Sequence, residues 1–390
     1  MKYSKNKKAR LALLSVSTFV IVLLSAEFAS RLVTFERTNK NLIFSISYKP
    51  YLGFINEPNF NRSYKMLNRF SGDEVQCRRS TNNWGFREDF DYTFFLKKEE
   101  NTKTILILGG SAVGGAGSST NDNVIDAALQ RLLNKKSQIK YIVYNFGNGG
   151  WVSFQEILGV LLFGFYLEPD WIIVMNGRND VAVGMDSREG PLAYAHNAVI
   201  ESFIKGYLMY GMNISFYRGE AENWVLKKSN LYRMLTGKKY IPKIQNTFEK
   251  YERIHVGQKT SWQDLDEIIQ LYIKNIEILE RLFPRSKLIA SLQPLCHKKK
   301  DIFKKLSSTE VQQQIDKGSD ITYHTAIQYF YTNLLDRKTK AGNKIIYAGD
   351  AFPDEFDPKT YFLDEAHLTD LGVEKTAEFY SKIILHAEQK

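Results

Sequence analysis

The sequence predicts a three-layer α/β/α domain built on a doubly wound, five-stranded parallel sheet. Two observations favour this class. Short apolar runs alternate with amphipathic helical stretches from residue 104 onward, and each run is apolar at nearly every position rather than every second one. Strands with that pattern are buried on both faces, which is typical of a parallel sheet covered by helices on each side.

Five apolar runs are the expected strands, in chain order TILIL at 104–108, YIVYN at 141–145, WIIVM at 171–175, KLIASL at 287–292 and KIIYA at 344–348. The expected helices lie near residues 122–135, 153–165, 262–282, 309–338 and 369–389. Residues 181–260 contain no strand of this alternation. We therefore interpret them as a helical insert that is rich in aromatic residues.

The beginning of the chain indicates a membrane anchor. Residues 1–10 carry five cations, and residues 11–26 carry no charge. A helix of about 20 mainly apolar residues can span a membrane, and the flanking cations stay in the cytoplasm. We predict an uncleaved signal anchor over 11–33, with the rest of the chain outside the cytoplasm. A cleaved signal peptide is the alternative, although no A-x-A cleavage site is evident.

Composition excludes several classes of function. The net charge is +10, of which residues 1–10 supply half, so the remainder is too mild to indicate nucleic-acid binding. Cys77 and Cys296 are the only cysteines, and they fit no metal-ligand spacing. They are either buried free thiols or a single disulfide bridge.

Residues 34–103 are polar, aromatic and without a clear period, and we interpret them as an extension wrapping the domain at 104–390.

Small or polar residues follow four of the five predicted strands. They are Gly109, Gly110 and Ser111 after the first strand, Gly147 and Gly150 after the second, Asn179 and Asp180 after the third, and Asp364 and His367 after the fifth. Ligands of open α/β sheets bind outside the carboxyl ends of the strands. We therefore expect these side chains to converge on one site, with Asp180 capping a helix or fixing its loop.

The glycine-rich loop after the first strand does not match the phosphate-binding loops. Gly110 and Gly115 have mononucleotide spacing, but Ala116 stands where the lysine of that motif belongs. The dinucleotide fingerprint G-x-G-x-x-G is also absent. The nucleophile elbow G-x-S-x-G is half matched, because Val113 replaces its last glycine. The loop therefore points to serine chemistry rather than to phosphate binding.

A serine nucleophile needs a base to take its proton and a third group to orient that base. The D-x-x-H formed by Asp364 and His367 can supply both to Ser111. The developing oxyanion needs preorganised donors. Candidates are the backbone N–H groups of Ser111 and Gly150 and the carboxamide of Asn179, with Gly147 as the alternative to Gly150.

Four blocks of the sequence resemble those of the SGNH, or GDSL-like, hydrolases, especially their membrane-anchored bacterial members. The blocks read LGGSAVGG, NFGNGGWVSFQE, NGRND and DEAHLTDLG, in the family's order. The resemblance spans about residues 104–385 and is weak through 181–260. It implies Ser111 as nucleophile, His367 as general base, Asp364 as its orienter, and Gly150 and Asn179 in the oxyanion hole. Gly110 stands where the family has its name-giving aspartate.

The fold expected on this basis is the flavodoxin-like form of the doubly wound sheet. The resemblance implies an extracytoplasmic, membrane-anchored serine esterase that removes acyl groups, above all acetyl, from an envelope carbohydrate or glycolipid. It requires no metal, cofactor or nucleic acid. Two alternatives stay open: an O-acyltransferase that modifies a polysaccharide with the same residues, and a non-catalytic envelope protein that binds or assembles.

Overall fold

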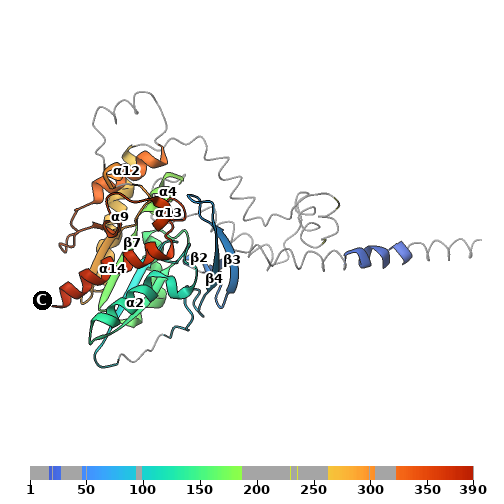
Figure 1. The fold of residues 1–390 in the computed structure, drawn as a ribbon, viewed down its shortest axis with the longest axis horizontal. Coiled ribbons are helices and arrows are strands. Elements are labelled where there is room, and N and C mark those ends of the chain that lie inside the picture. The colour runs from blue at the N-terminus through green and yellow to red at the C-terminus, as the bar shows by residue number, and fades with distance from the viewer. Residues whose placement is uncertain are drawn as a thin grey trace, which may run out of the picture. The chain divides into compact units, whose positions relative to one another are not determined.

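The computed structural model in Figure 1 describes residues 17–19, 21–27, 46–49, 51–93, 99–186, 229, 235, 262–297, 299–303 and 322–389. The chain divides into two compact units, one of residues 1–43 with 201–251 and one of residues 44–200 with 252–390. All named strands and helices belong to the second unit. In the first unit, residues 17–19 and 21–27 are helical, and the Ser229 hydroxyl donates to Glu27 over 2.7 Å.

The predicted anchor and insert lie mostly outside the described residues. Within the described part of the chain, no helix is long and apolar enough to cross a membrane. The anchor over 11–33 and the helical insert at 181–260 therefore stay predictions.

A five-stranded parallel sheet forms the centre of the second unit. Its strands are β5 (Thr102–Gly109), β6 (Lys140–Gly147), β7 (Trp171–Asn176), β8 (Lys287–Leu292) and β9 (Ile346–Tyr347). Their order is β6-β5-β7-β8-β9, and every pairing is parallel. This order is the flavodoxin-like one, so the predicted five-stranded sheet and its winding are confirmed.

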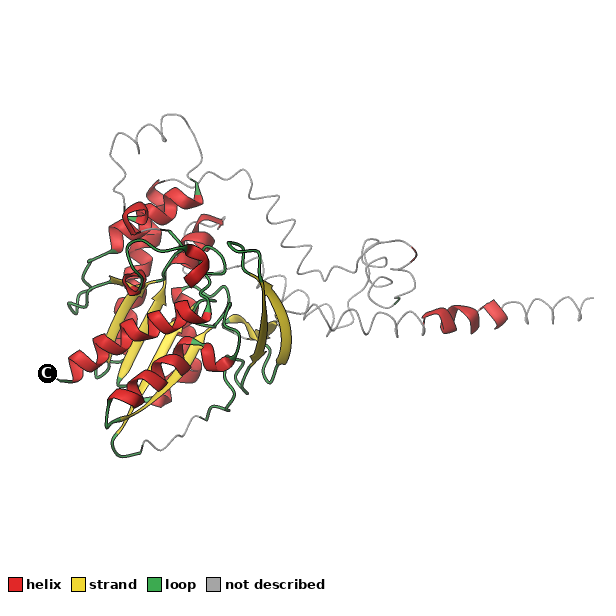
Figure 2. Ribbon diagram, in the orientation of Figure 1, coloured by secondary structure: helices red, strands yellow, loops and turns green. Residues whose placement is uncertain are grey.

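Helices cover both faces of the sheet (Figure 2). On one face lie α2 (Ile125–Lys136) and α14 (Asp370–Glu388), and on the other α3 (Ser153–Gly159), α4 (Arg178–Asp186), α9 (Trp262–Leu282) and α12 (Tyr323–Leu334). Two short helices, α10 (Lys299–Ile302) and α13 (Pro358–Tyr361), follow β8 and β9. Much of the predicted helix 309–338 lies outside the described residues, and α12 is its described part.

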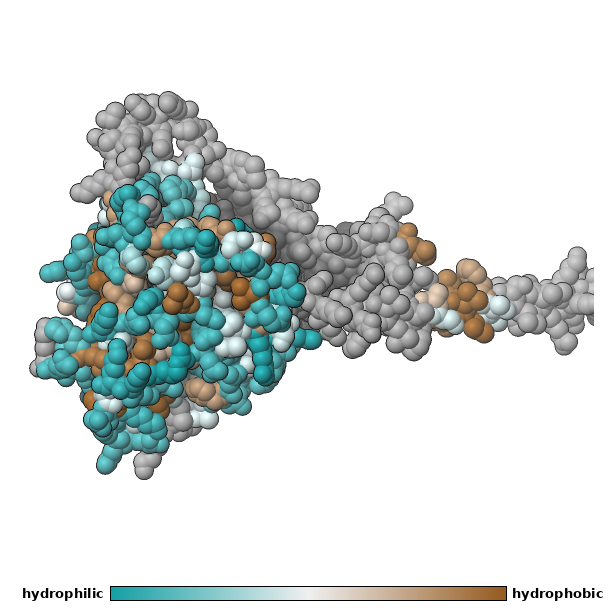
Figure 3. Space-filling view, viewed as in Figure 1, coloured by the Kyte–Doolittle hydropathy of each residue, from teal (hydrophilic) through white to brown (hydrophobic). Residues whose placement is uncertain are grey.

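The strands are apolar throughout because both faces are buried. Ile105, Ile107 and Ile173 are fully buried beneath α2 and α14. The alternate residues Leu106 and Leu108 are equally buried on the opposite face. Each such side chain stabilises the fold by about 1.5–3 kcal/mol. On the side of the molecule drawn in Figure 3, hydrophilic residues cover most of the described surface.

The α-helix expected over 153–165 ends at Gly159, and other helical forms follow it. After α3 the chain forms a π-helical turn at Val160–Gly164 and a 3-10 turn at Phe165–Leu167. Gly159 lies against the ring of Trp151, where a β-carbon would come within 2.8 Å of a ring carbon. This glycine lets the helix approach the tryptophan, a tertiary contact that helical periodicity does not encode.

Residues 46–80 form two β-hairpins, whereas the sequence predicted an irregular extension. The first pairs β1 (Ile46–Lys49) with β2 (Gly53–Asn56), and the second pairs β3 (Asn61–Leu67) with β4 (Glu74–Ser80). Strand β2 is buried at all four positions, and the less exposed face of β3 carries Arg62 beside Tyr64 and Met66, so neither strand shows alternating hydrophobicity in its sequence. Period-two alternation is the main sequence indication of a strand, and its absence explains the error.

The extension packs on the sheet through aromatic rings. Phe86 is fully buried, with its ring centroid 4.5 Å from Phe146 of β6 and 5.6 Å from Phe163. It also meets Trp151 edge-on at 6.0 Å. These contacts place the second hairpin and the following turn beside the loops that leave the carboxyl ends of β5 and β6.

Candidate active site

Three predicted residues form a continuous hydrogen-bond chain. Ser111 follows the end of β5, and its Oγ lies 2.8 Å from Nε2 of His367. The other ring nitrogen of His367, Nδ1, lies 2.8 Å from Oδ2 of Asp364. All three are partly exposed, the side chains of His367 and Asp364 by 24% and 20%. The site is therefore open to a substrate from solvent.

Asp364 is held as a carboxylate. Burial alone raises the pKa of its carboxyl, but the contact with His367 and two backbone hydrogen bonds outweigh burial and lower it. Its Oδ1 accepts from the backbone N–H groups of Ala366 and His367, each over 3.0 Å. Because an ionised carboxylate can only accept, Nδ1 of His367 carries the ring proton, and Nε2 presents its lone pair to Ser111.

The glycines before Ser111 provide space for close backbone packing. A β-carbon on Gly109 would lie 2.5 Å from the carbonyl oxygen of Met175 in β7. A β-carbon on Gly110 would lie 2.4 Å from Nδ2 of Asn179. Position 110 therefore has no room for a side chain unless Asn179 moves.

Gly150 and Asn179 follow β6 and β7, the two strands that flank β5. Gly150 sits in the turn at 148–151, closed by a 3.2 Å hydrogen bond from the Trp151 N–H to the Asn148 carbonyl. Its φ of +79° is the value that the third position of a type II turn requires, and glycine adopts it without strain. Asn179 donates one Nδ2 hydrogen to the Trp151 carbonyl over 2.8 Å, which fixes the carboxamide beside Gly110.

Gly147, the alternative oxyanion glycine, is placed differently. Its N–H donates to Oδ1 of Asn145 over 2.8 Å within the protein interior. A β-carbon there would lie 2.3 Å from the backbone nitrogen of Gly114. Gly147 thus serves the packing of β6 against the Ser111 loop, and its N–H is already engaged by Asn145.

Asp180 fixes the turn beside Asn179, in line with the role predicted for it. Its Oδ1 accepts from the backbone N–H of Ser153 over 3.1 Å, at the first residue of α3. Burial raises the pKa of its carboxyl. The first turn of α4 is therefore tied to residues 151–153 by two successive side chains, Asn179 and Asp180.

Sequence reasoning missed Arg87, which holds the loop after Ser111. Its side chain is fully buried, and its guanidinium donates to the carbonyls of Gly115, Ser118 (3.0 Å) and Arg78 (3.0 Å) and to Oδ1 of Asn121 (2.9 Å). Charged residues are almost always exposed, and nothing in the segment NNWGFRE indicates that its arginine is buried.

The same extension holds the segment before Asp364. The buried side chain of Asn68 donates to the carbonyls of Lys359 over 3.2 Å and Phe362 over 3.3 Å. The backbone N–H of Arg69 donates to Leu363 over 2.7 Å. The extension thus contacts both the loop after the nucleophile and the segment that leads to its base.

Within the described part of the chain, no three His, Cys, Asp or Glu residues are grouped so as to hold a metal ion. Cys77 and Cys296 are both buried free thiols, which decides between the two alternatives for them.

Comparison with known proteins identifies no family. No family model matches the chain, and no curated protein sequence matches it. Among solved structures, the chain resembles the acetylxylan esterase Axe2 of Geobacillus stearothermophilus (12% identity, 72% of this chain and 93% of that chain, TM-score 0.35).

Two further solved structures show similar likeness. They are a putative arylesterase of Agrobacterium tumefaciens (15% identity, 73% and 99% of the chains, TM-score 0.36) and a lipase/acylhydrolase of Enterococcus faecalis (11%, 72% and 95%, TM-score 0.33). These likenesses are too weak to assign the chain to a family, so its function is inferred from the site itself.

Proposed function

We propose that this protein is a serine esterase that removes acyl groups, above all acetyl, from a carbohydrate or glycolipid through an acyl-enzyme. The observation that carries the proposal is the hydrogen-bond chain from Ser111 through His367 to Asp364, with 2.8 Å at both links. Such a chain activates a hydroxyl that is otherwise a weak nucleophile.

The reaction follows from the placement of these groups. Ser111 Oγ attacks the ester carbonyl while its proton passes to Nε2 of His367, and Asp364 stabilises the imidazolium that forms. The collapse of the tetrahedral intermediate expels the sugar hydroxyl, which takes the proton from His367. A water molecule, deprotonated by the same nitrogen, then releases the acid and restores Ser111.

Three donors would stabilise the oxyanion of each tetrahedral intermediate. They are the backbone N–H groups of Ser111 and Gly150 and the second Nδ2 hydrogen of Asn179. The hydrogen bond from Asn179 to the Trp151 carbonyl holds this amide in place before substrate binds. Loss of one such donor lowers kcat by about 10²- to 10³-fold.

The charge pattern of residues 1–26 supports a substrate outside the cytoplasm. Five cations in residues 1–10 precede the uncharged stretch 11–26, the charge pattern of a signal anchor with a cytoplasmic N-terminus. A carbohydrate or glycolipid of the envelope is the ester that an enzyme anchored this way would meet.

The proposal is tested by ester hydrolysis and covalent labelling. Wild-type protein should hydrolyse p-nitrophenyl acetate and react with a fluorophosphonate probe, whereas Ser111→Ala and His367→Ala should lose at least about 10³-fold of the rate. A folded wild-type protein that neither hydrolyses the ester nor takes the label would refute the proposal and favour a non-catalytic binding or assembly role.

Transfer to a second hydroxyl uses the same residues, since an acceptor sugar can replace water in the last step. Free acetate and acetylated sugar should both be measured with an O-acetylated donor and an unacetylated oligosaccharide. Acetate release at an unchanged rate when acceptor is added supports the esterase. Acetate appearing on the acceptor at the expense of release identifies an O-acyltransferase.

A further inference from the structure

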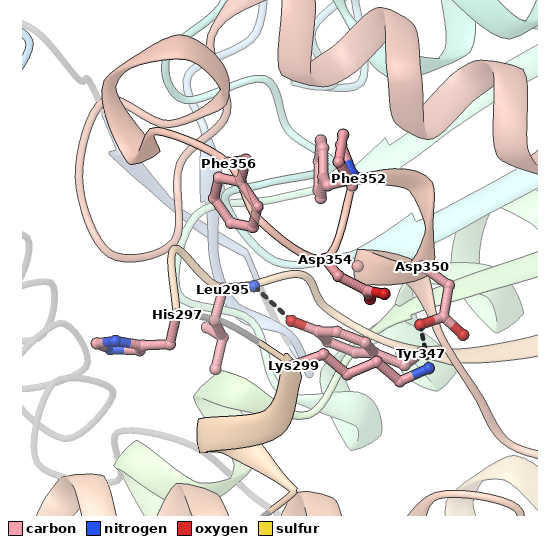
Figure 4. Close-up of a pocket in the computed structure, with 10 residues that line it drawn as sticks. Leu295, His297, Lys299, Tyr347, Asp350, Phe352, Asp354 and Phe356 are labelled. Atoms are coloured by element: carbon pink, nitrogen blue, oxygen red, sulfur yellow. Dashed lines mark hydrogen bonds and ion pairs between the residues drawn. The ribbon is translucent and has the colours of Figure 1, made fainter.

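A hollow lies at the carboxyl ends of β8 and β9, the same edge of the sheet at which Ser111 follows β5. It has a volume of about 230 Å³ and opens between the loop that follows β8 and the loop that follows β9 (Figure 4). Ligand pockets for drug-sized molecules measure about 300–1,000 Å³, so this one suits a single small ring.

The hollow continues the row of strands that carries the catalytic groups. Ser111 follows β5 and Asn179 follows β7, and β8 and β9 are the next strands in the sheet. Adjacent strands lie about 4.8 Å apart, which places the hollow about 10–15 Å along the edge from Ser111. A substrate of several linked rings could therefore occupy both places.

The wall of the hollow is bonded to the segment that carries His367. The backbone N–H of Cys296, between lining residues Leu295 and His297, donates to the Glu365 carbonyl over 3.0 Å. The side chain of Gln293 donates to the Ala366 carbonyl over 3.1 Å. These two hydrogen bonds fix the hollow relative to the base.

Aromatic rings form one wall. The centroids of Phe352 and Phe356 lie 5.8 Å apart, and Phe356 is half-buried. Tyr347 is buried, and its hydroxyl accepts from the backbone N–H of Leu295 over 3.2 Å, so its ring rather than its hydroxyl faces the space (Figure 4). Flat apolar walls of this kind pack against the C–H faces of a ring.

The polar groups at the rim suit a neutral ligand that carries hydroxyls. Lys299 and Asp350 form an ion pair of 2.6 Å and cancel each other's charge. Burial, followed by the neighbouring His324, lowers the pKa of His297, so its imidazole is neutral at pH 7. Asp354 is exposed and lines the hollow, and its carboxylate can only accept hydrogen bonds (Figure 4).

We infer that this hollow binds one neutral, hydroxyl-bearing sugar ring of the substrate, with Phe356 packing against the ring and Asp354 accepting from its hydroxyls. An anionic group such as a phosphate would be repelled by Asp354. The inference rests on the proposed function, because it places this ring next to the sugar whose ester reaches Ser111.

The test compares Asp354→Asn and Phe356→Ala with matched controls. Glu355→Gln removes the exposed carboxylate next in the chain, which does not line the hollow, and Phe165→Ala removes an exposed ring elsewhere. Substrates are p-nitrophenyl acetate and partially O-acetylated oligosaccharides of glucose, xylose, mannose and N-acetylglucosamine. For each variant, kcat/KM for the oligosaccharide is divided by kcat/KM for p-nitrophenyl acetate. For at least one sugar series, Asp354→Asn and Phe356→Ala should each lower this ratio by about tenfold, equivalent to about 1.4 kcal/mol, because KM for the oligosaccharide rises.

A binding measurement removes the chemistry altogether. Unacetylated oligosaccharides of the preferred sugar are titrated calorimetrically into Ser111→Ala protein with and without Asp354→Asn, and the second substitution should weaken binding about tenfold. If Asp354→Asn gives the same ratios and affinities as Glu355→Gln for every sugar, and Ser111-dependent ester hydrolysis is observed, the inference is overturned and the proposed function is kept. Absence of any Ser111-dependent hydrolysis marks failure of the proposed function instead.

Discussion

The two carboxylate oxygens of Asp364 bind different groups. Oδ1 binds the backbone N–H groups of Ala366 and His367, which shapes the turn, and Oδ2 binds the imidazole. The shape of the turn and the orientation of the base therefore depend on one side chain. The lowered pKa of this carboxyl means that its ionised form stabilises the fold above the ordinary aspartate pKa of about 3.9, and that this contribution is lost as the pH falls towards its lower folded pKa.

Replacing Asp364 by asparagine should separate orientation from shape. An amide whose oxygen takes the place of Oδ1 keeps both backbone hydrogen bonds, but its NH2 group then faces Nδ1 and cannot accept its proton or stabilise the imidazolium. We expect kcat for p-nitrophenyl acetate to fall about 10³- to 10⁴-fold. Glu365→Gln removes the charge of the exposed neighbouring side chain and should stay within twofold of wild type. Equal losses in the two variants would show that general charge near the site, not the contact with His367, matters.

Gly110 permits a second test at the level of one residue. Gly110→Ala would place a β-carbon within 2.4 Å of Nδ2 of Asn179 and displace this amide from the oxyanion hole. We expect kcat to fall about 10²-fold with little change in KM. Gly149→Ala is the matched control, because a β-carbon there meets nothing within 4 Å. Unchanged steady-state kinetics in Gly110→Ala would argue against a role for Asn179 in the oxyanion hole.

At the level of elements, the extension joins parts of the site that are far apart in the chain. Arg87 binds the loop at 115–118, Asn68 binds the segment at 359–362, and the Phe54 carbonyl accepts from Nε1 of Trp151 over 3.0 Å. The hairpins thus support the nucleophile, the base and the oxyanion turn together. A buried guanidinium with four acceptors cannot be replaced by a lysine, whose ammonium has three donors and no fork geometry.

Arg87→Lys should therefore impair both stability and chemistry. At least one hydrogen bond to a charged group is lost and its acceptor stays buried, which costs about 2–4 kcal/mol. We expect Tm to fall by about 5–15 °C, and kcat to fall while KM for p-nitrophenyl acetate is kept, because the loop after Ser111 loses its support. Arg285→Lys, at an exposed position, is the control. A fall in Tm with unchanged kcat would restrict Arg87 to stability.

How well each strand or helix could be predicted depends on whether its sequence pattern is local or depends on tertiary contacts. The strand at 287–292 and the helix at 262–282 match β8 and α9 residue for residue, because apolar runs and 3.6-residue periodicity are local properties. Strand β9 has only two residues, since it pairs with β8 at just two positions. The hairpins escaped prediction because β2 and β3 lack alternating hydrophobicity in their sequences. Arg87 and Asn68 act through tertiary hydrogen bonds that no local pattern encodes.

At the scale of the whole molecule, the strand order explains why four distant blocks meet. The order reverses direction beside β5, and the crevice outside the strand ends at such a reversal is where ligands of doubly wound sheets bind. Ser111 follows β5 and Asn179 follows β7, the two strands that flank this reversal. The candidate site could thus be predicted from the residues after each strand once the sheet was expected, whereas the support from the extension could not.

The fold also contains buried carboxyl groups that destabilise the folded state when they are ionised. Glu156 is 1% exposed, its Oε2 accepts from Asn176 over 2.6 Å, and its Oε1 has no hydrogen-bond partner among the described residues. Burial, with Asp180 adding to it, raises the pKa of Glu156 well above its usual value, and burial raises that of Asp126 to about 6. A carboxyl of this kind favours the folded state in its neutral form. Its contribution is complete below the unfolded pKa of about 4.3 and is lost as the pH rises through the folded pKa.

Glu156→Gln should therefore flatten the dependence of stability on pH. Glutamine keeps the shape and the hydrogen bond from Asn176 but has no charge to lose, so the fall in Tm between pH 5 and pH 8 should be smaller than in wild type, and Tm at pH 8 should be equal or higher. Thermal unfolding followed by circular dichroism at both pH values measures this, with the exposed Glu100→Gln as the charge-matched control. Parallel curves for wild type and Glu156→Gln would mean that Glu156 is already ionised in the folded protein throughout pH 5 to 8. In that case a charge on this buried carboxyl would have to be balanced by the hydrogen bond from Asn176.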